Sequence, residues 1–252
     1  MKVIVIGGTG LIGSKVVSLL AEHGHEAVAA SPNSGVNTIT GEGVAAALAG
    51  ADVVVDVSNS PSFADDDVLA FFTTSTRTLL DAERDAGVRH HVALSIVGAD
   101  LLPDSGYLRA KVAQERLIAE SGQPYTIVRA TQFFEFAKRI ADEATVDGVA
   151  RVSTGSMQPI AAADVSAAVA RAAVGDPVDG IVEIGGPEKL SMAEFLGRRL
   201  ETDGDDRQIV ADAQSPYFGT LLAGDELTPG PDAQLAPTSF AEWLAAQASP
   251  VR

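Results

Sequence analysis

The chain has 252 residues, no cysteine, and a formal net charge of −16 from 34 acidic and 18 basic side chains. The lack of cysteine excludes disulfides, cysteine–zinc sites and thiol catalysis. The negative charge disfavours phosphate backbones and anionic headgroups, so we expect neither nucleic acid nor a membrane as a partner.

The first half of the chain alternates short apolar runs with helical patterns. Strands are predicted at residues 2–6, 26–30, 36–40, 52–57, 90–96 and 125–128, and helices at residues 11–23, 42–49, 64–86 and 105–121. Because these strands are almost continuously apolar, we expect both faces of each to be buried. The pattern predicts an α/β fold, a Rossmann-like doubly wound parallel sheet with a small C-terminal substrate lobe.

After Arg129 the alternation loosens. Helices are predicted near residues 133–144, 163–174, 191–201 and 240–247, short strands at 149–152 and 181–184, and a Gly- and Pro-rich loop at 215–237. We predict a single domain over residues 1–252, whose core comprises about 1–130 and 150–185. The substrate lobe would comprise about 131–149 and 186–252, over the sheet edge where open α/β sheets bind ligands.

No apolar run approaches the roughly 20 residues that a membrane helix needs. Glycines at 7, 8 and 10 interrupt the first apolar run. That run is therefore interpreted as a strand rather than a signal peptide, and we expect a cytoplasmic protein.

The segment Gly7-Gly8-Thr9-Gly10-Leu11-Ile12-Gly13 has the pattern G-x-x-G-x-x-G between the first strand and the first helix. Gly7 permits a tight turn, Gly10 lets the backbone approach a pyrophosphate, and Gly13 permits close packing. The helix N-terminus adds free N–H donors and a partial positive charge. This pattern predicts a dinucleotide site; the alternative is a glycine turn without a ligand.

The residues after the second strand bear on the choice between NAD and NADP. An acidic side chain for the ribose of NAD usually stands there, and residues 29–34 contain neither Asp, Glu nor Arg. Ser31, Asn33 and Ser34 offer hydrogen bonds to a 2′-phosphate, and Lys15 offers a cation. NADP is therefore weakly favoured over NAD; the alternative is that these are ordinary turn residues.

Several short motifs follow one another over residues 1 to about 200. They are the glycine loop, residues 47–54 (ALAGADVV), residues 91–98 (HVALSIVG), Tyr107 and Lys111 as Y-x-x-x-K with Glu115 after them, residues 124–129 (PYTIVR), Pro159-Ile160 with Asp164-Val165, and residues 185–188 (GGPE). Together they resemble the atypical short-chain dehydrogenases/reductases, in particular the NmrA-like NAD(P)-binding branch.

This resemblance implies an NAD(P) site under the glycine loop and a substrate pocket beneath the lobe. It implies cofactor contacts from Gly7, Thr9, Gly10, Leu11 and Ile12, and it places Val57, Ser58 and Asn59 beside the ribose on the nicotinamide side. It also implies a possible homodimer through the helices at 64–86 and 105–121, by analogy alone.

Ser95, Tyr107 and Lys111 resemble the catalytic triad of that family. A phenol has an unperturbed pKa of about 10, so it needs a nearby cation to exchange protons near neutrality. A lysine four residues later lies on the same helix face and supplies that charge. Ser95 would orient the substrate carbonyl. The alternative is a tyrosine at a helix start with a solvated lysine.

Further candidates follow the strand at 125–128. Gln132 and Phe133 are predicted to line the substrate pocket, whereas Phe134 and Phe136 are predicted to lie in the core. Tyr217 and Phe218 are candidates for a lid. The spacing of His23 and His25 supports no metal site, and we expect none.

Three functions fit these residues. The first is an NAD(P)-dependent oxidoreductase that transfers hydride between nicotinamide and a small carbonyl, alcohol or quinone. The second is a redox sensor of the NmrA type, which would bind NAD(P) without turnover. The third, an epimerase or dehydratase, is disfavoured because no feature of the sequence recognises a nucleotide sugar.

Overall fold

The computed structural model describes residues 1–248. Its main element is a seven-stranded sheet of order β12-β9-β5-β4-β3-β1-β2 in which every neighbouring pair is parallel. The strands are β1 (Lys2–Ile6), β2 (Glu26–Ala30), β3 (Val53–Asp56), β4 (His90–Ile96), β5 (Tyr125–Ala130), β9 (Gly180–Gly185) and β12 (Gln234–Leu235). The predicted Rossmann-like sheet is thereby confirmed.

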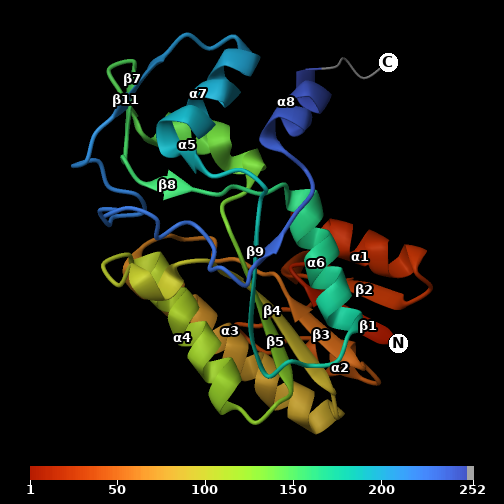
Figure 1. Ribbon diagram of the computed structural model, residues 1–252. Coiled ribbons are helices and arrows are strands. Elements are labelled where there is room, and N and C mark those ends of the chain that lie inside the picture. Colours follow the sequence, from red (N-terminus) through yellow and green to blue (C-terminus); the bar gives the residue numbers. More distant parts are fainter. Residues whose placement is uncertain (249–252) are drawn as a thin grey trace.

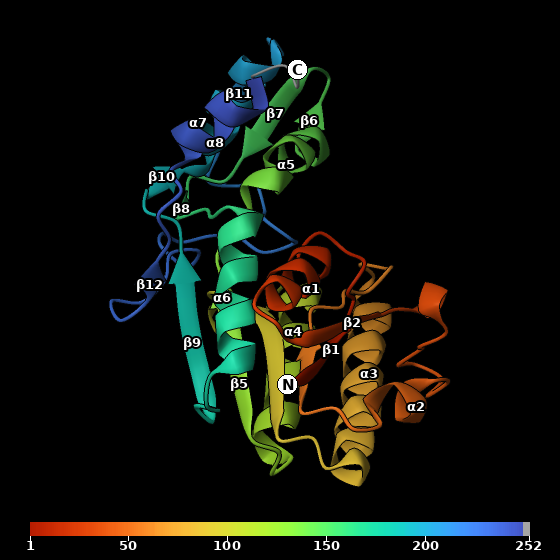
Figure 2. The ribbon, with the colours of Figure 1, turned by 90° about the vertical axis from the view of Figure 1, so that its right-hand side faces the viewer.

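Helices cover both faces of this sheet (Figure 2). One face carries α1 (Gly13–Glu22) and α6 (Ala162–Val174), and the other carries α2 (Val44–Leu48), α3 (Asp65–Ala86) and α4 (Gly106–Glu120). Side chains of β1 alternate between the faces: Val3 and Val5 pack toward α1 and α6, whereas Ile4 and Ile6 pack toward α2 and α3. Burial on both sides explains the continuously apolar strands.

The predicted strand at residues 36–40 does not form. Gly35 and Gly41 have φ values of +81° and +79°, and the side-chain oxygen of Asn37 accepts the N–H groups of Ile39 and Thr40. These local bonds replace a strand ladder. Alternate residues of the segment are nevertheless buried, which is why its pattern resembles that of a strand. As a result, β2 remains the edge of the sheet.

A lobe lies beyond the carboxyl ends of the strands (Figure 1). It contains α5 (Ala137–Glu143), α7 (Met192–Asp203), α8 (Phe240–Ala248), a sheet of β6 (Thr145–Val146), β7 (Val149–Val152) and β11 (Gln208–Ala211), and a pair of β8 (Ser156–Met157) with β10 (Leu190–Ser191). Its core is aromatic, with Phe134 and Phe195 both packed on Phe240. Two boundaries differ from the prediction: β7 and β8 lie in the lobe, and β12 joins the main sheet.

Short 3-10 turns connect several elements, at Pro32–Ser34, Ala99–Leu101 and Phe134–Phe136. None of the helices in residues 1–248 combines the length and apolar composition that crossing a bilayer requires.

A buried ion pair fastens α4 to the end of β5. Arg129 donates to both carboxylate oxygens of Glu115, at 2.9 and 2.7 Å, and its third donor reaches Asp100 at 2.9 Å. The two carboxylates differ in burial, because the side chain of Glu115 is 7% exposed and that of Asp100 is 52% exposed. Glu115, which follows the Y-x-x-x-K motif, therefore holds the helix that carries the motif.

We expect Glu115→Ala to lower the free energy of unfolding by about 3 kcal/mol, because it leaves a buried guanidinium without its main partner. Asp100→Ala, which removes the exposed partner of the same arginine, should cost less than about 1 kcal/mol. Urea denaturation followed by circular dichroism measures both. Equal losses in the two variants would contradict this account of the ion pair.

Candidate active site

The glycine loop packs directly on backbone atoms of neighbouring strands. Gly7 follows β1 with a φ of +76°, and a Cβ built there would lie 2.9 Å from the Cα of Ser58. A Cβ on Gly8 would lie 2.6 Å from the Cα of Ala29, and one on Gly13 would lie 2.2 Å from the carbonyl oxygen of Gly7. Because real Cβ atoms do not approach this closely, these positions require glycine.

The start of α1 faces open space. A Cβ at Gly10 would meet only the carbonyl oxygen of Gly7, at 3.3 Å. Among the described residues, the N–H groups of Leu11 and Ile12 donate to no backbone carbonyl. They are the free donors of a helix N-terminus, where an anion is stabilised by hydrogen bonds and by the helix dipole.

A cavity of about 850 Å³ begins at this loop and extends under the lobe. Its walls come from the carboxyl ends of β1, β3, β4 and β5, from α4, and from the lobe. Of the predicted site residues, the following line it: Gly7, Thr9, Gly10, Leu11, Ile12, Ser31, Val57, Ser58, Asn59, Ser95, Tyr107, Lys111, Gln132 and Phe133. The fold thus brings together residues that lie far apart in the chain.

Two predicted residues, Asn33 and Ser34, do not line the cavity. The hydroxyl of Ser34 accepts the N–H of Ser31 and donates to its carbonyl oxygen, so it caps the turn after β2. Ser31 itself is buried, and its own hydroxyl has no partner among the described residues. Lys15 is exposed on α1 and does not reach the cavity wall.

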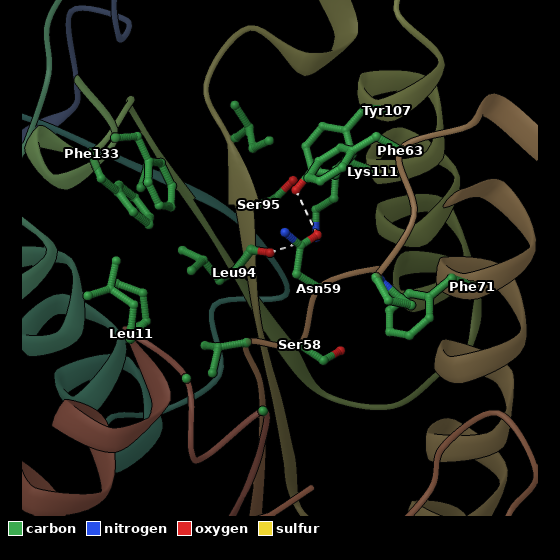
Figure 3. A pocket seen from close by; sticks show the side chains of 18 of the residues that line it. Leu11, Ser58, Asn59, Phe63, Phe71, Leu94, Ser95, Tyr107, Lys111 and Phe133 are labelled. Atoms are coloured by element: carbon green, nitrogen blue, oxygen red, sulfur yellow. Dashed lines mark hydrogen bonds between the residues drawn. The ribbon is translucent and has the colours of Figure 1, made fainter. Parts of the chain in front are cut away.

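Tyr107 and Ser95 meet at the other end of the cavity. The Tyr107 hydroxyl donates to the side-chain oxygen of Asn59 at 3.0 Å, and Figure 3 shows it pointing into the same space as the Ser95 hydroxyl. Ser95 is buried, and its hydroxyl has no hydrogen-bond partner in the part of the chain that is described. Burial raises the pKa of Tyr107 to about 12, against the opposing charge of Arg139. The phenol therefore holds its proton at neutral pH.

Lys111 lies one helical turn after Tyr107 and is buried (Figure 3). Its ammonium donates to the carbonyl oxygen of Leu94 at 2.8 Å and to the side-chain oxygen of Gln114, and it lies 4.3 Å from the centre of the Phe72 ring. Burial lowers the pKa of Lys111 to about 8, although the Asp56 carboxylate opposes this shift.

Gln114 connects this lysine to the end of β3. Its amide donates to one carboxylate oxygen of Asp56 at 3.0 Å, and the other oxygen accepts the hydroxyl of Ser58 at 2.6 Å. Asp56 is itself buried. A chain of polar groups therefore runs from the cavity wall at Ser58 to Lys111, and it holds the lysine side chain in one position.

Sequence reasoning missed part of the cavity wall. Phe63 and Arg139 line the cavity although their local sequences carry no motif. Phe136, predicted to lie in the core, is 40% exposed and faces the cavity, because the 3-10 turn Phe134–Phe136 directs only Phe134 into the lobe. Tyr217 and Phe218, the lid candidates, also line it.

The residues present fit a nicotinamide dinucleotide. Three buried polar atoms that line the cavity have no partner among the described residues, namely the hydroxyls of Ser31 and Ser95 and the amide oxygen of Gln132. Such atoms normally have a partner, so they indicate positions where a bound molecule supplies one. The glycine cradle at the start of α1 provides donors for a pyrophosphate.

Curated proteins with related sequences match part of the chain. The Photosystem II assembly factor Ycf39 of Cyanophora paradoxa is 27% identical over an alignment of 165 positions, and the match covers 58% of this chain and 51% of that protein. The chain thus spans about half the length of the curated relatives it matches.

Solved structures share the fold at low sequence identity. MoeE5 in complex with UDP-glucose and NAD has a TM-score of 0.77 and 21% identity, covering 98% of this chain and 97% of that one. The NADPH-dependent quinone oxidoreductase QOR2 from Escherichia coli, complexed with NADPH, has a TM-score of 0.66 and 20% identity. The match covers 83% of this chain and 77% of that one.

A family profile described as NAD(P)H-binding matches residues 7–176. The match spans the glycine loop, the end of β3, the Ser95 strand, the helix with Tyr107 and Lys111, and α6. The chain therefore belongs to the NAD(P)H-binding family, and it has the Rossmann-like fold of the solved structures named above.

Proposed function

We propose that the protein is an NAD(P)-dependent oxidoreductase that acts on a small carbonyl, alcohol or quinone. One observation carries the proposal: the cavity that starts at the glycine loop ends at the Tyr107 hydroxyl and the unpartnered hydroxyl of Ser95. A cofactor held at the loop and a substrate oxygen held at these hydroxyls would occupy one continuous space.

In this proposal the bound cofactor supplies or accepts a hydride. The Ser95 hydroxyl donates a hydrogen bond to the substrate oxygen and orients it. Tyr107, whose pKa is raised by burial to about 12, gives its proton to that oxygen during reduction and takes one back during oxidation. A phenol that is protonated at neutral pH favours the direction of reduction.

Lys111 supplies positive charge to a protein whose net charge is −16. The cofactor carries a negatively charged pyrophosphate, which the overall field of the protein disfavours. A local ammonium and the N–H groups at the start of α1 therefore have to provide the attraction. The polar chain through Gln114 and Asp56 holds that ammonium at the cavity wall.

One observation favours the second candidate, a sensor that binds NAD(P) without turnover. Within the described part of the chain, the hydrogen bonds of Lys111 go to Leu94 and Gln114, and none goes to Tyr107. In that arrangement the lysine does not activate the phenol directly. Measured turnover separates the two candidates, because a sensor needs none.

Weak NADP preference is proposed for the adenosine end of the cavity. Ser31 offers a neutral hydroxyl, and the one acidic side chain on the wall within residues 1–248, Glu143, lies on α5 of the lobe and is paired with Arg139. Within residues 1–248, the only cations on the wall are Lys111 and Arg139, and the strong phosphate partner that usually selects NADP is absent from this end.

Tyr107→Phe should lower turnover by about 10²- to 10⁴-fold, because it removes the proton donor, and it should leave the cofactor dissociation constant within about twofold. Oxidation of NADH or NADPH with a panel of carbonyls and quinones measures turnover. Tyr125→Phe, which removes a hydroxyl outside the cavity, is the matched control. Undiminished hydride transfer in Tyr107→Phe would remove this residue from the mechanism, and cofactor binding without any turnover would favour the sensor.

Cofactor affinity should fall as the pH rises from 7 to 9. Lys111 has a pKa of about 8 in the unliganded protein, so it is a cation below that pH and loses its charge above it. An anionic ligand binds the charged form better, so the dissociation constant should rise by up to about tenfold across this range. Fluorescence titration with the reduced cofactor measures it. Lys111→Met should give weak binding that is flat with pH, and an equally steep profile in that variant would disprove this role.

Ser31→Asp should reverse the cofactor preference. A carboxylate repels a 2′-phosphate and accepts hydrogen bonds from a free ribose, so the ratio of the NADP and NAD dissociation constants should rise at least about tenfold. Ser31→Ala is the control, because it removes the hydroxyl without adding charge. An unchanged ratio in Ser31→Asp would show that the 2′ position lies elsewhere.

A further inference from the structure

The aromatic residues of this chain are concentrated around one cavity. The sequence has nine Phe, three Tyr and one Trp, thirteen aromatic residues in all. Seven of the thirteen line the cavity, namely Phe63, Phe71, Tyr107, Phe133, Phe136, Tyr217 and Phe218. Only 5% of the residues are aromatic, and more than half of these line one cavity.

These rings form two walls that face each other. Phe133 stacks on Phe136 with ring centres 5.3 Å apart and planes 26° apart. On the other side, Tyr107 stacks on Phe218 at 5.7 Å and 24°, and Phe63 lies 5.4 Å from Tyr107. Figure 3 shows Phe133 across the cavity from Phe63 and Tyr107, with the Ser95 strand between them. The space is therefore bounded by aromatic surfaces on both sides.

The second wall is held at some conformational cost. Phe218 has a φ of +47°, a left-handed conformation that a bulky side chain rarely adopts. It lies at the tip of a turn closed by two backbone bonds between Tyr217 and Thr220. Contacts of its ring with Tyr107 and Phe63 maintain this geometry, which places an aromatic ring at the mouth of the substrate end.

The charged side chains at this end are few, and each already has hydrogen-bond partners. Within residues 1–248, the ionisable acids and bases on the wall apart from Tyr side chains are Lys111, Arg139 and Glu143. Arg139 donates to Glu143 at 2.7 Å and lies over the Phe63 ring at 5.2 Å. Lys111 is buried with its donors directed to Leu94 and Gln114. A diphosphate, such as that of a nucleotide sugar, would have to compete with Glu143 for Arg139 and with the cofactor for the charge of Lys111.

We propose that the substrate end binds a neutral, planar aromatic carbonyl compound, with its ring between the two walls and its oxygen at Ser95 and Tyr107. This proposal rests on the proposed function and names its substrate class. Flat rings stack favourably on aromatic walls, whereas a saturated ring of the same size makes fewer close contacts. The two hydroxyls fix the position of a single oxygen, as the polar groups in mostly apolar pockets do.

Binding of 1,4-naphthoquinone tests the proposal. Calorimetric titration is carried out with the protein saturated by oxidised NAD or NADP, so that no hydride transfer occurs. The chain has no cysteine, so the quinone cannot add to a thiol. Decahydronaphthalene-1,4-dione, which has the same carbon skeleton and carbonyls without planarity, is the matched ligand. We expect the naphthoquinone to bind at least about tenfold more tightly than this diketone, and more tightly than UDP-glucose.

Variants locate the site. Phe133→Leu and Phe136→Leu should each weaken naphthoquinone binding by about 3- to 10-fold and change diketone binding by less than about twofold. Tyr125→Leu, which removes an aromatic ring outside the cavity, should change the binding of neither ligand. Naphthoquinone binding that is no tighter than diketone binding, tighter binding of UDP-glucose, or unchanged binding in both Phe variants overturns the substrate class. Cofactor affinity is measured separately in every variant. A protein that does not bind NAD or NADP at all would instead overturn the proposed function.

Discussion

The missing side chains at Gly7, Gly8 and Gly13 are the constraint on which the site depends. At each position a Cβ would overlap backbone atoms of the loop itself or of a neighbouring strand. Their absence lets the loop settle onto the ends of β2 and β3 and starts α1 at the sheet edge. Any larger residue would push the loop outward, and the helix N-terminus would no longer open into the cavity.

Burial then determines the chemistry that the cavity offers. The same desolvation keeps Tyr107 protonated and weakens the hold of Lys111 on its proton, so the two pKa values move in opposite directions. The carboxylate of Asp56, reached through Gln114, limits the effect on the lysine. The end of β3, which borders the cavity through Ser58, is thereby coupled to the charge of Lys111 below Tyr107.

The sequence predicts the parts of the fold and of the site that depend on local sequence patterns. The strand at residues 90–96 was predicted to the residue, because a run whose centre is apolar (Val92, Ala93 and Leu94) lies between glycine turn signals at Gly87 and Gly98. The glycine loop and the Tyr107 helix follow from spacing on regular elements. Residues 36–40 were mispredicted as a strand because buried and exposed residues alternate there. Hydrogen bonds to the Asn37 side chain hold this segment as a turn instead.

The aromatic wall could not be predicted for a different reason. Phe63 and Phe218 lie in connecting segments, more than 150 positions apart in the chain, and nothing local indicates that they meet. Phe136 lies two residues after the buried Phe134 in a 3-10 turn. The spacing of an α-helix therefore does not predict which of the two side chains faces the core. Cavity walls built from loops depend on tertiary packing, which periodicity does not encode.

The lobe is assembled from two separate stretches of chain, and the main domain joins them. The strand β7 pairs with β11, and β8 pairs with β10, in each case across α6, which covers the main sheet, and β9, which belongs to it. The helix α6 also packs on α1, where the Ser166 hydroxyl lies 3.4 Å from the carbonyl oxygen of Ile12. One helix therefore supports both the lobe and the glycine loop, so the two ends of the cavity share a single mechanical anchor.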